Sequence, residues 1–372
     1  MGSAIPSRDR PAPPAAPNRS SRAAMLHVRG PLVLSALAVA LVVVFVLSLG
    51  IGQYPIAPDE VVAILFSKIG IHLNIDFTVQ QADVLTIVRM PRVIMGLFIG
   101  AALAVSGAAI QGLFRNPLAD PGLIGISAGA SFAVAAMIVL GNSALIGIQD
   151  LLGNLTLPIA AFTGGLVTTL VIYRLATFGG RTNVATMLLA GIAINALAGA
   201  GIGMLISLSN DDQLRDITFW NLGNLNRTTW DSVRVSLPFL IFALIAMPLL
   251  ARPLNAFLLG ESEAGHLGVN VERTKQAVVV LSALAVGAGV AVAGVVNFIG
   301  LVVPHLLRLS VGPDHRYVLP GSALLGGVLL VIADLIARTL PYEVPLGIIT
   351  ALVGGPFFLW LLLRDRTRGF AG

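Results

Sequence analysis

Long apolar stretches, separated by short polar gaps, fill almost the whole chain between Leu32 and Leu363. A helix that crosses a bilayer needs about 20 apolar residues, because all its backbone hydrogen bonds must be made inside the segment. We therefore expect an all-α integral membrane protein with about ten transmembrane helices, the eighth of them short and interrupted by Pro304. The expected spans are about 32–52, 93–113, 122–141, 155–175, 184–208, 234–252, 276–296, 298–311, 319–340 and 345–363.

The composition agrees with a membrane bundle. Hydrophobic residues make up 56% and charged residues 11% of the chain, whereas soluble domains carry roughly 25% charge. The 40 glycines fit closely packed helices, with small residues four apart at Gly96/Gly100 and Gly125/Gly129. The sequence contains no cysteine, which excludes disulfides, thiolate metal sites and cysteine nucleophiles. The sequence has no basic stripe interleaved with aromatic residues, the pattern that would indicate nucleic-acid binding.

The ends and the loops predict an orientation. Residues 1–31 resemble a disordered cytoplasmic leader, residues 32–363 a transmembrane domain and residues 364–372 a cytoplasmic tail. The first apolar stretch is full length without a clear cleavage site, which favours a retained helix over a cleaved signal peptide. Short cytoplasmic loops accumulate Lys and Arg, and sixteen such residues fall on the side of the termini. The seven on the other side are Lys68, Arg89, Arg92, Arg215, Arg227, Arg234 and Arg338.

Three polar stretches interrupt the apolar pattern. Arg89-Met-Pro-Arg92 precedes a span that ends in a turn rich in proline and glycine, residues 111–122, where Asn116 and Asp120 can bond freed backbone groups. The loop from Pro253 to Lys275 alternates apolar and polar residues, which suggests short helices offering one face to a partner, although a solvated connector would also fit. The third stretch runs over residues 294–338.

Charges in the third stretch, and motifs that are missing, narrow the function. Asp334 and Arg338 share one helical face, so we expect a charge pair that is either structural or functional. The only lysines, Lys68 and Lys275, do not lie in a G-x-x-x-x-G-K-[ST] loop, so nucleotide hydrolysis would belong to another polypeptide. Asp334 is the one carboxylate near a span. Because ion-coupled carriers usually need ionisable groups inside the membrane, an ion-coupled secondary carrier is the weaker alternative. No Ser/His/Asp grouping or H-E-x-x-H helix supports an intramembrane enzyme, and no catalytic or metal-binding residue is predicted.

These stretches carry a family resemblance that covers nearly everything after residue 31. The sequence resembles the FecCD-type permeases of bacterial ABC importers for ferric siderophores, haem and vitamin B12, and most of all the haem branch. The segments that carry it are 89–92 (RMPR), 100–107 (GAALAVSG), 115–122 (RNPLADPG), 189–193 (LAGIA), 267–269 (LGV), 298–305 (FIGLVVPH), 312–316 (GPDHR) and 345–351 (PLGIITA).

The resemblance implies a fold and an assembly. We expect the type II ABC importer permease fold, in the bacterial inner membrane, with both termini in the cytoplasm. Two permease copies would form a homodimer, two separate ATPase subunits would bind ATP and Mg beneath it, and a periplasmic substrate-binding protein would deliver the cargo. This chain itself would bind no cofactor.

The resemblance also implies residue roles. Arg89, Arg92 and Arg338 match positions that pair with acidic residues of the binding protein. The loop at about 258–275 matches the coupling helices that contact the ATPase, with candidate residues Leu259, Gly260, Glu261, Ala264, Gly265, His266, Leu267 and Gly268. Asn116, Leu118, Val184 and Ala185 match positions that narrow the path at its cytoplasmic end.

The cargo is less determined than the class. Vitamin B12 permeases carry small hydroxyl residues where this chain has Val184 and Ala185, which makes cobalamin less suitable. Residues 122–129 and 259–268 look most like the haem branch. Haem is therefore the leading interpretation, with a ferric siderophore or cobalamin as alternatives.

Overall fold

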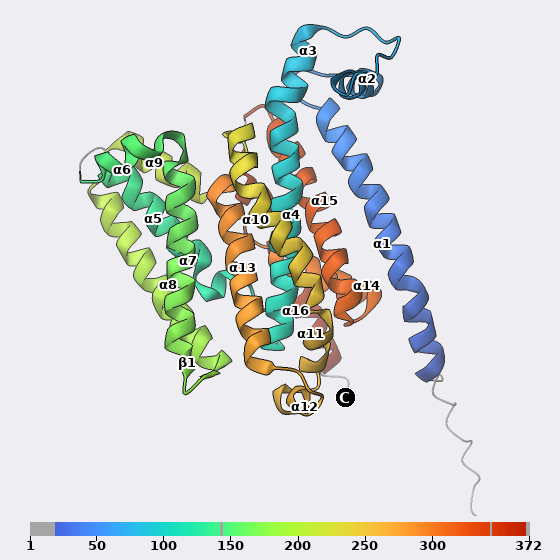
Figure 1. The fold of residues 1–372 in the computed structure, drawn as a ribbon, viewed down its shortest axis with the longest axis vertical. Helices are drawn as coiled ribbons and strands as arrows, with labels where there is room; N and C mark the ends of the chain where they lie inside the picture. Colours follow the sequence, from blue (N-terminus) through green and yellow to red (C-terminus); the bar gives the residue numbers. More distant parts are fainter. Residues whose placement is uncertain (1–18, 142–143, 343, 370–372) are drawn as a thin grey trace, which may run out of the picture.

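The computed structural model describes residues 19–141, 144–342 and 344–369, with side chains between 29 and 361 and at 363. Within these residues, ten long or apolar helices form a bundle of roughly parallel and antiparallel segments (Figure 1). They are α1 (Arg19–Gly50), α4 (Met90–Phe114), α5 (Ile126–Leu140), α7 (Thr156–Ala176), α8 (Val184–Ser207), α10 (Trp230–Leu249), α13 (Val271–Ala293), α14 (Ile299–Val311), α15 (His315–Thr339) and α16 (Leu346–Gly369).

Shorter elements lie at the two ends of this bundle (Figure 1). One end, here called the α9 end, carries α2 (Pro58–Lys68), α3 (Val79–Asp83), α6 (Ile146–Leu152), the 3-10 turn η3 (Gly153–Leu155) and α9 (Asp211–Asn221). The opposite, α12 end carries α11 (Ala251–Phe257), α12 (Glu261–His266) and a hairpin of β1 (Thr177–Phe178) and β2 (Arg181–Thr182). A π-helix, η1 (Val84–Arg89), joins α3 to α4, and a 3-10 turn, η2 (Pro121–Ile124), precedes α5.

Helix α4 is the centre of the bundle and packs against α10, α13, α14 and α15. Small residues allow this burial, because they let neighbouring backbones approach closely. A Cβ atom at Gly107 would collide with the backbone of Gly300 on α14, and one at Gly100 would collide with the carbonyl of Gly326 on α15. The predicted spacing of Gly96 and Gly100 thus lies at a real helix contact.

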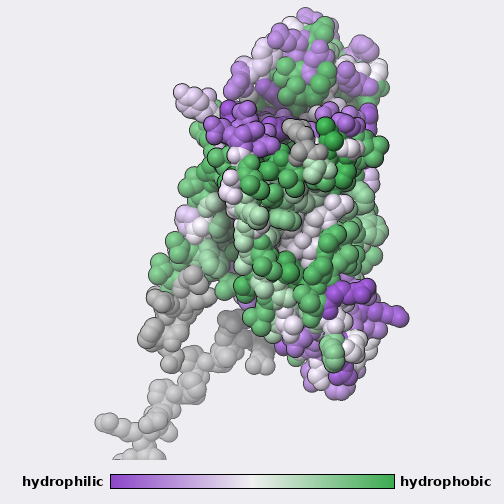
Figure 2. Space-filling view, turned by 90° about the vertical axis from the view of Figure 1, so that its left-hand side faces the viewer, coloured by the Kyte–Doolittle hydropathy of each residue, from purple (hydrophilic) through white to green (hydrophobic). Residues whose placement is uncertain are grey.

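A helix is present at each of the ten predicted spans. Among the described residues, seven helical segments are long and apolar enough to cross a membrane, and three shorter apolar helices accompany them. Figure 2 shows a broad apolar band on the face in view, with hydrophilic residues gathered at both ends. The segment from Val79 to Phe114 is continuously helical, so the second helix begins earlier than predicted.

Two helices extend beyond the predicted spans, and α14 runs through Pro304. Helix α1 begins at Arg19, inside the predicted leader, and α16 continues to Gly369, inside the predicted tail; residues 1–18 and 370–372 lie outside the described residues. Pro304 does not break α14. Proline leaves the carbonyl four residues earlier without its helical donor, and Gln111 Nε2 donates to that carbonyl, Gly300 O, at 3.3 Å. The side chain therefore replaces the bond that the proline removes.

Candidate functional sites at the two ends of the bundle

Two of the three predicted docking arginines cap helix α1 at the α9 end. The last carbonyls of a helix have no partner within it, and positive charge is favourable there. Arg89 Nη1 donates to Leu49 O at 2.8 Å and to Gly50 O at 2.9 Å, and its Nη2 donates to Tyr54 O. Arg338 Nη2 donates to Ser48 O and, at 2.6 Å, to Ser48 Oγ. These bonds hold the end of α1 against α4 and α15.

The third arginine forms a buried ion pair. Arg92 Nη2 lies 2.8 Å from Asp334 Oδ1, and Arg92 Nε lies 3.0 and 3.1 Å from the two carboxylate oxygens. The side chains are only 12% and 3% exposed. The predicted pair of Asp334 and Arg338 is present but looser, at 3.8 Å. Asp334 therefore joins α4 to α15 mainly through Arg92.

The three arginines consequently have partners within this chain. Arg89 is 5% and Arg338 is 8% exposed. Their location at the α9 end agrees with the predicted side, whereas a contact with a binding protein stays a prediction. The sequence could place Asp334 and Arg338 on one helix face, but it could not reveal Arg92 as the closer partner, since that pair spans 242 positions.

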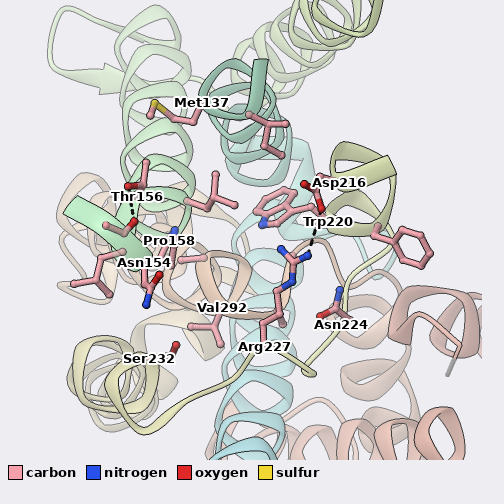
Figure 3. A pocket seen from close by; sticks show the side chains of 18 of the residues that line it. Met137, Asn154, Thr156, Pro158, Asp216, Trp220, Asn224, Arg227, Ser232 and Val292 are labelled. Atoms are coloured by element: carbon pink, nitrogen blue, oxygen red, sulfur yellow. Dashed lines mark hydrogen bonds and ion pairs between the residues drawn. The ribbon is translucent and has the colours of Figure 1, made fainter. Parts of the chain in front are cut away.

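A cavity of about 900 Å³ opens at the same end, between α5, α7, α9, α10 and α13 (Figure 3). Arg227 points across it to Asp216, beside Trp220, and Arg227 Nη2 lies 3.3 Å from Asp216 Oδ1. Both side chains are more than half exposed, so this pair contributes little to stability. The described residues contain no group of three or more His, Cys, Asp and Glu side chains that could hold a metal ion.

The predicted coupling loop contains the short helix α12, and the short helix α11 ends directly before this loop, at the α12 end (Figure 1). Gly260 and Gly268 take φ angles of 119° and 82°, which L side chains rarely adopt, and they delimit α12. Leu259 and Leu267 are 66% and 64% exposed, whereas Ala264 is buried. Of the other predicted coupling residues, Gly265, His266 and Gly268 are exposed, and Gly260 and Glu261 are half-buried. The segment thus offers apolar side chains outward from the bundle end.

The predicted gate residues lie in two places at that end. Asn116 Oδ1 accepts from Leu118 N at 2.9 Å, and Asp120 Oδ1 accepts from Gly122 N at 2.7 Å, as predicted for this turn. Leu118 is 42% exposed and lines a small hollow with residues of α14 and α16. Val184 and Ala185 begin α8, next to the β1–β2 hairpin.

A charged cluster that the sequence did not predict connects α12 to this hairpin. Lys275 Nζ lies 2.7 Å from Glu261 Oε2 and 3.2 Å from Glu272 Oε1, and it donates to Thr182 O at 2.8 Å. Glu272 Oε2 accepts from Thr182 N at 2.9 Å. The Lys275 side chain is 3% exposed. Lys275 is one of only two lysines in the chain, and this rarity was the signal that the sequence offered. Its partners could not be predicted from sequence spacing.

The architecture is that of a multi-pass helical membrane protein with a polar segment at each end. The FecCD transport family matches residues 40–364, and the chain belongs to that family. It is a permease subunit of an ABC transporter, as the resemblance implied.

Individual relatives support the same class. The chain is 49% identical over 281 residues to the hemin transport system permease protein HmuU of Yersinia pestis, covering 75% of this chain and 83% of that protein. It is 43% identical over 279 residues to the cobalamin import system permease protein BtuC of Halobacterium salinarum, covering 75% and 73%. A solved structure of a metal-chelate type ABC transporter in an inward-facing conformation has a TM-score of 0.77 and 29% identity, covering 90% of this chain and 99% of that one.

Proposed function

We propose that this permease moves haem from the periplasm to the cytoplasm, as half of an ATP-driven importer in the bacterial inner membrane. The observation that carries the proposal is the 49% identity to a hemin permease over 281 residues. The 43% identity to a cobalamin permease makes cobalamin the second candidate, and a ferric siderophore remains the third. The cargo is a substrate, and ATP and Mg belong to the partner ATPase.

The exposed face of α8 supports a homodimer. A run of small residues is exposed along this helix, at Ala193, Ala196, Gly199, Ala200 and Gly203. A Cβ at Gly199 or at Gly203 would meet nothing within 4 Å in this chain. Small residues spaced along one face of a membrane helix favour close association with another helix, so a second copy of this chain is the proposed neighbour.

The two ends receive different partners in this proposal. The α12 end faces the cytoplasm, where α12 and its exposed leucines contact the ATPase and Asn116, Leu118, Val184 and Ala185 narrow the path. The α9 end faces the periplasm and receives the substrate-binding protein, with Arg89, Arg92 and Arg338 contributing positive charge near the docking surface. Positive charge near a docking surface steers and orients a partner more than it holds that partner.

The test is uptake by vesicles that carry the permease, its ATPase and its binding protein. We expect ATP-dependent accumulation of haem, and much slower accumulation of a ferric siderophore and of cobalamin. The matched control replaces ATP with a non-hydrolysable analogue, which should abolish uptake.

Each alternative gives a different result. Preferential uptake of cobalamin or of the siderophore would reassign the cargo within the family. Uptake driven by an ion gradient in vesicles that hold this chain alone would contradict the importer assignment.

A further inference from the structure

The Lys275 cluster joins three segments that are distant in sequence. Lys275 belongs to the first turns of α13, Glu261 opens α12, and Thr182 belongs to β2 of the hairpin. The buried ammonium group of Lys275 lies within 3.2 Å of Glu261 on α12, of Glu272 on its own helix and of the Thr182 carbonyl on β2, so it connects the three segments. A buried charge must keep its partners, because losing one leaves the other charge uncompensated.

The hairpin is in turn attached to the start of α8. Thr182 and Asn183 adjoin, and Asn183 Oδ1 accepts from Thr186 N at 3.0 Å, which caps α8. The backbone N–H of Asn183 also donates to Ala176 O at 2.9 Å, which closes the hairpin onto α7. A displacement of β2 would therefore move the first turn of α8, where Val184 and Ala185 lie.

We propose that Lys275 is a positioning residue that makes the α7–α8 hairpin follow α12, so that movement of α12 by the ATPase is delivered to the start of α8. The proposal rests on the function proposed above and adds the route by which one end of the chain transmits motion. An ion pair suits this role better than apolar packing, because its hydrogen bonds fix direction and distance. A hollow of about 630 Å³ beside the cluster, lined by residues of the hairpin, α8, α12 and α13, leaves space for the hairpin to move if the link is cut.

The first experiment measures coupling in the complete complex. Lys275→Met keeps an unbranched side chain, one atom shorter, and removes the charge. We expect haem uptake per ATP hydrolysed to fall about tenfold while ATP hydrolysis persists. Lys275→Arg keeps the charge and the donors, and should retain the wild-type ratio. Lys68→Met applies the same change to the exposed lysine at the α9 end and should alter nothing. Glu261→Gln cuts only the bond to α12 and should also uncouple.

The second experiment does not depend on transport. Because the chain has no cysteine, spin labels can be placed uniquely through Phe178→Cys in the hairpin and Gly265→Cys in α12. Phe178 is 93% exposed, and a Cβ at Gly265 would meet nothing within 4 Å. The distance distribution between the labels should be narrow in the otherwise wild-type permease and broad with Lys275→Met.

The outcomes separate the link from the function. The proposed link between α12 and the hairpin through Lys275 is overturned if Lys275→Met leaves the distance distribution unchanged. It is also overturned if Lys275→Met keeps the wild-type ratio of uptake to hydrolysis, or if Lys68→Met uncouples the complex equally. Loss of ATPase binding in the Lys275→Met complex overturns it too, because Lys275 would then serve assembly. If the wild-type complex moved no haem while the distances behaved as expected, the cargo assignment would fail and the link would stand.

Discussion

The buried pair of Arg92 and Asp334 shows why a charge inside the bundle needs a partner. In a chain with 11% charged residues, a carboxylate that is 3% exposed must be compensated, because desolvating an isolated charge costs several kcal/mol. Arg92 supplies two hydrogen bonds and Arg338 adds a weaker attraction. A charge reversal at Arg92 would therefore damage the fold as well as any docking surface, so it cannot separate the two roles.

A compensated double variant can separate them. Asp334→Asn alone should lower the free energy of unfolding by about 3–5 kcal/mol, because it leaves Arg92 buried without its carboxylate. Arg92→Gln/Asp334→Asn removes both charges together and should recover most of that loss. If Arg92 also contacts the binding protein, the double variant should bind that protein more weakly at wild-type stability. Unfolding of the detergent-solubilised permease and binding-protein affinity are the two measurements.

The exposed ion pair of Arg234 and Asp231 is the matched control. These side chains are 76% and 77% exposed, so Asp231→Asn should change the free energy of unfolding by at most about 1 kcal/mol. Wild-type affinity in the compensated double variant would show that Arg92 serves only the fold.

At the scale of the helix, α4 and α8 use small residues for opposite purposes. Gly107 on α4 lies against the backbone of α14, whereas Gly199 and Gly203 on α8 face open space. The same residue type thus marks a contact already made within the chain and a surface that remains free for another chain. Only the structure distinguishes the two, because both helices are rich in Gly and Ala.

Leucine substitutions test this distinction. Gly199→Leu/Gly203→Leu should leave the protomer folded, because both sites have room, while lowering the proportion of dimer about tenfold by preventing close approach of the α8 faces. Gly147→Leu on α6, where a Cβ also meets nothing within 4 Å, should leave the dimer intact. Gly107→Leu should reduce the yield of folded protein. Native mass spectrometry of the purified permease measures both states, and an unaffected dimer would exclude α8 from the interface.

The elements that sequence predicted well are those that depend on local composition. Ten apolar stretches gave ten helices, because a membrane span is specified by its own residues. The hairpin before α8 was not predicted; its two glycines, Gly179 and Gly180, at φ 58° and 75° are the signal that could have found it. The ion pair of Arg92 and the Lys275 cluster depend on contacts between distant segments, which no local pattern contains.

At the scale of the whole molecule, the distribution of basic residues predicts how the bundle sits in the membrane. The helix order places the predicted seven basic side chains at the α9 end, and the hairpin, α11 and the start of α13 carry Arg181, Arg252, Arg273 and Lys275 at the other (Figure 1). The apolar band lies between these ends (Figure 2). Since Lys and Arg are retained on the cytoplasmic side, the α12 end should face the cytoplasm.

The absence of native cysteines makes this orientation directly measurable. Lys68→Cys places one thiol on α2 at the α9 end, and Gly265→Cys places one on α12; both positions are exposed. A membrane-impermeant maleimide should label Lys68→Cys in spheroplasts and Gly265→Cys only in inside-out vesicles. The reverse pattern would place the α12 end in the periplasm and exclude a contact between α12 and the ATPase. With the orientation as proposed, adding the ATPase should slow labelling of Gly265→Cys and leave Lys68→Cys unaffected, because the enzyme would cover only α12.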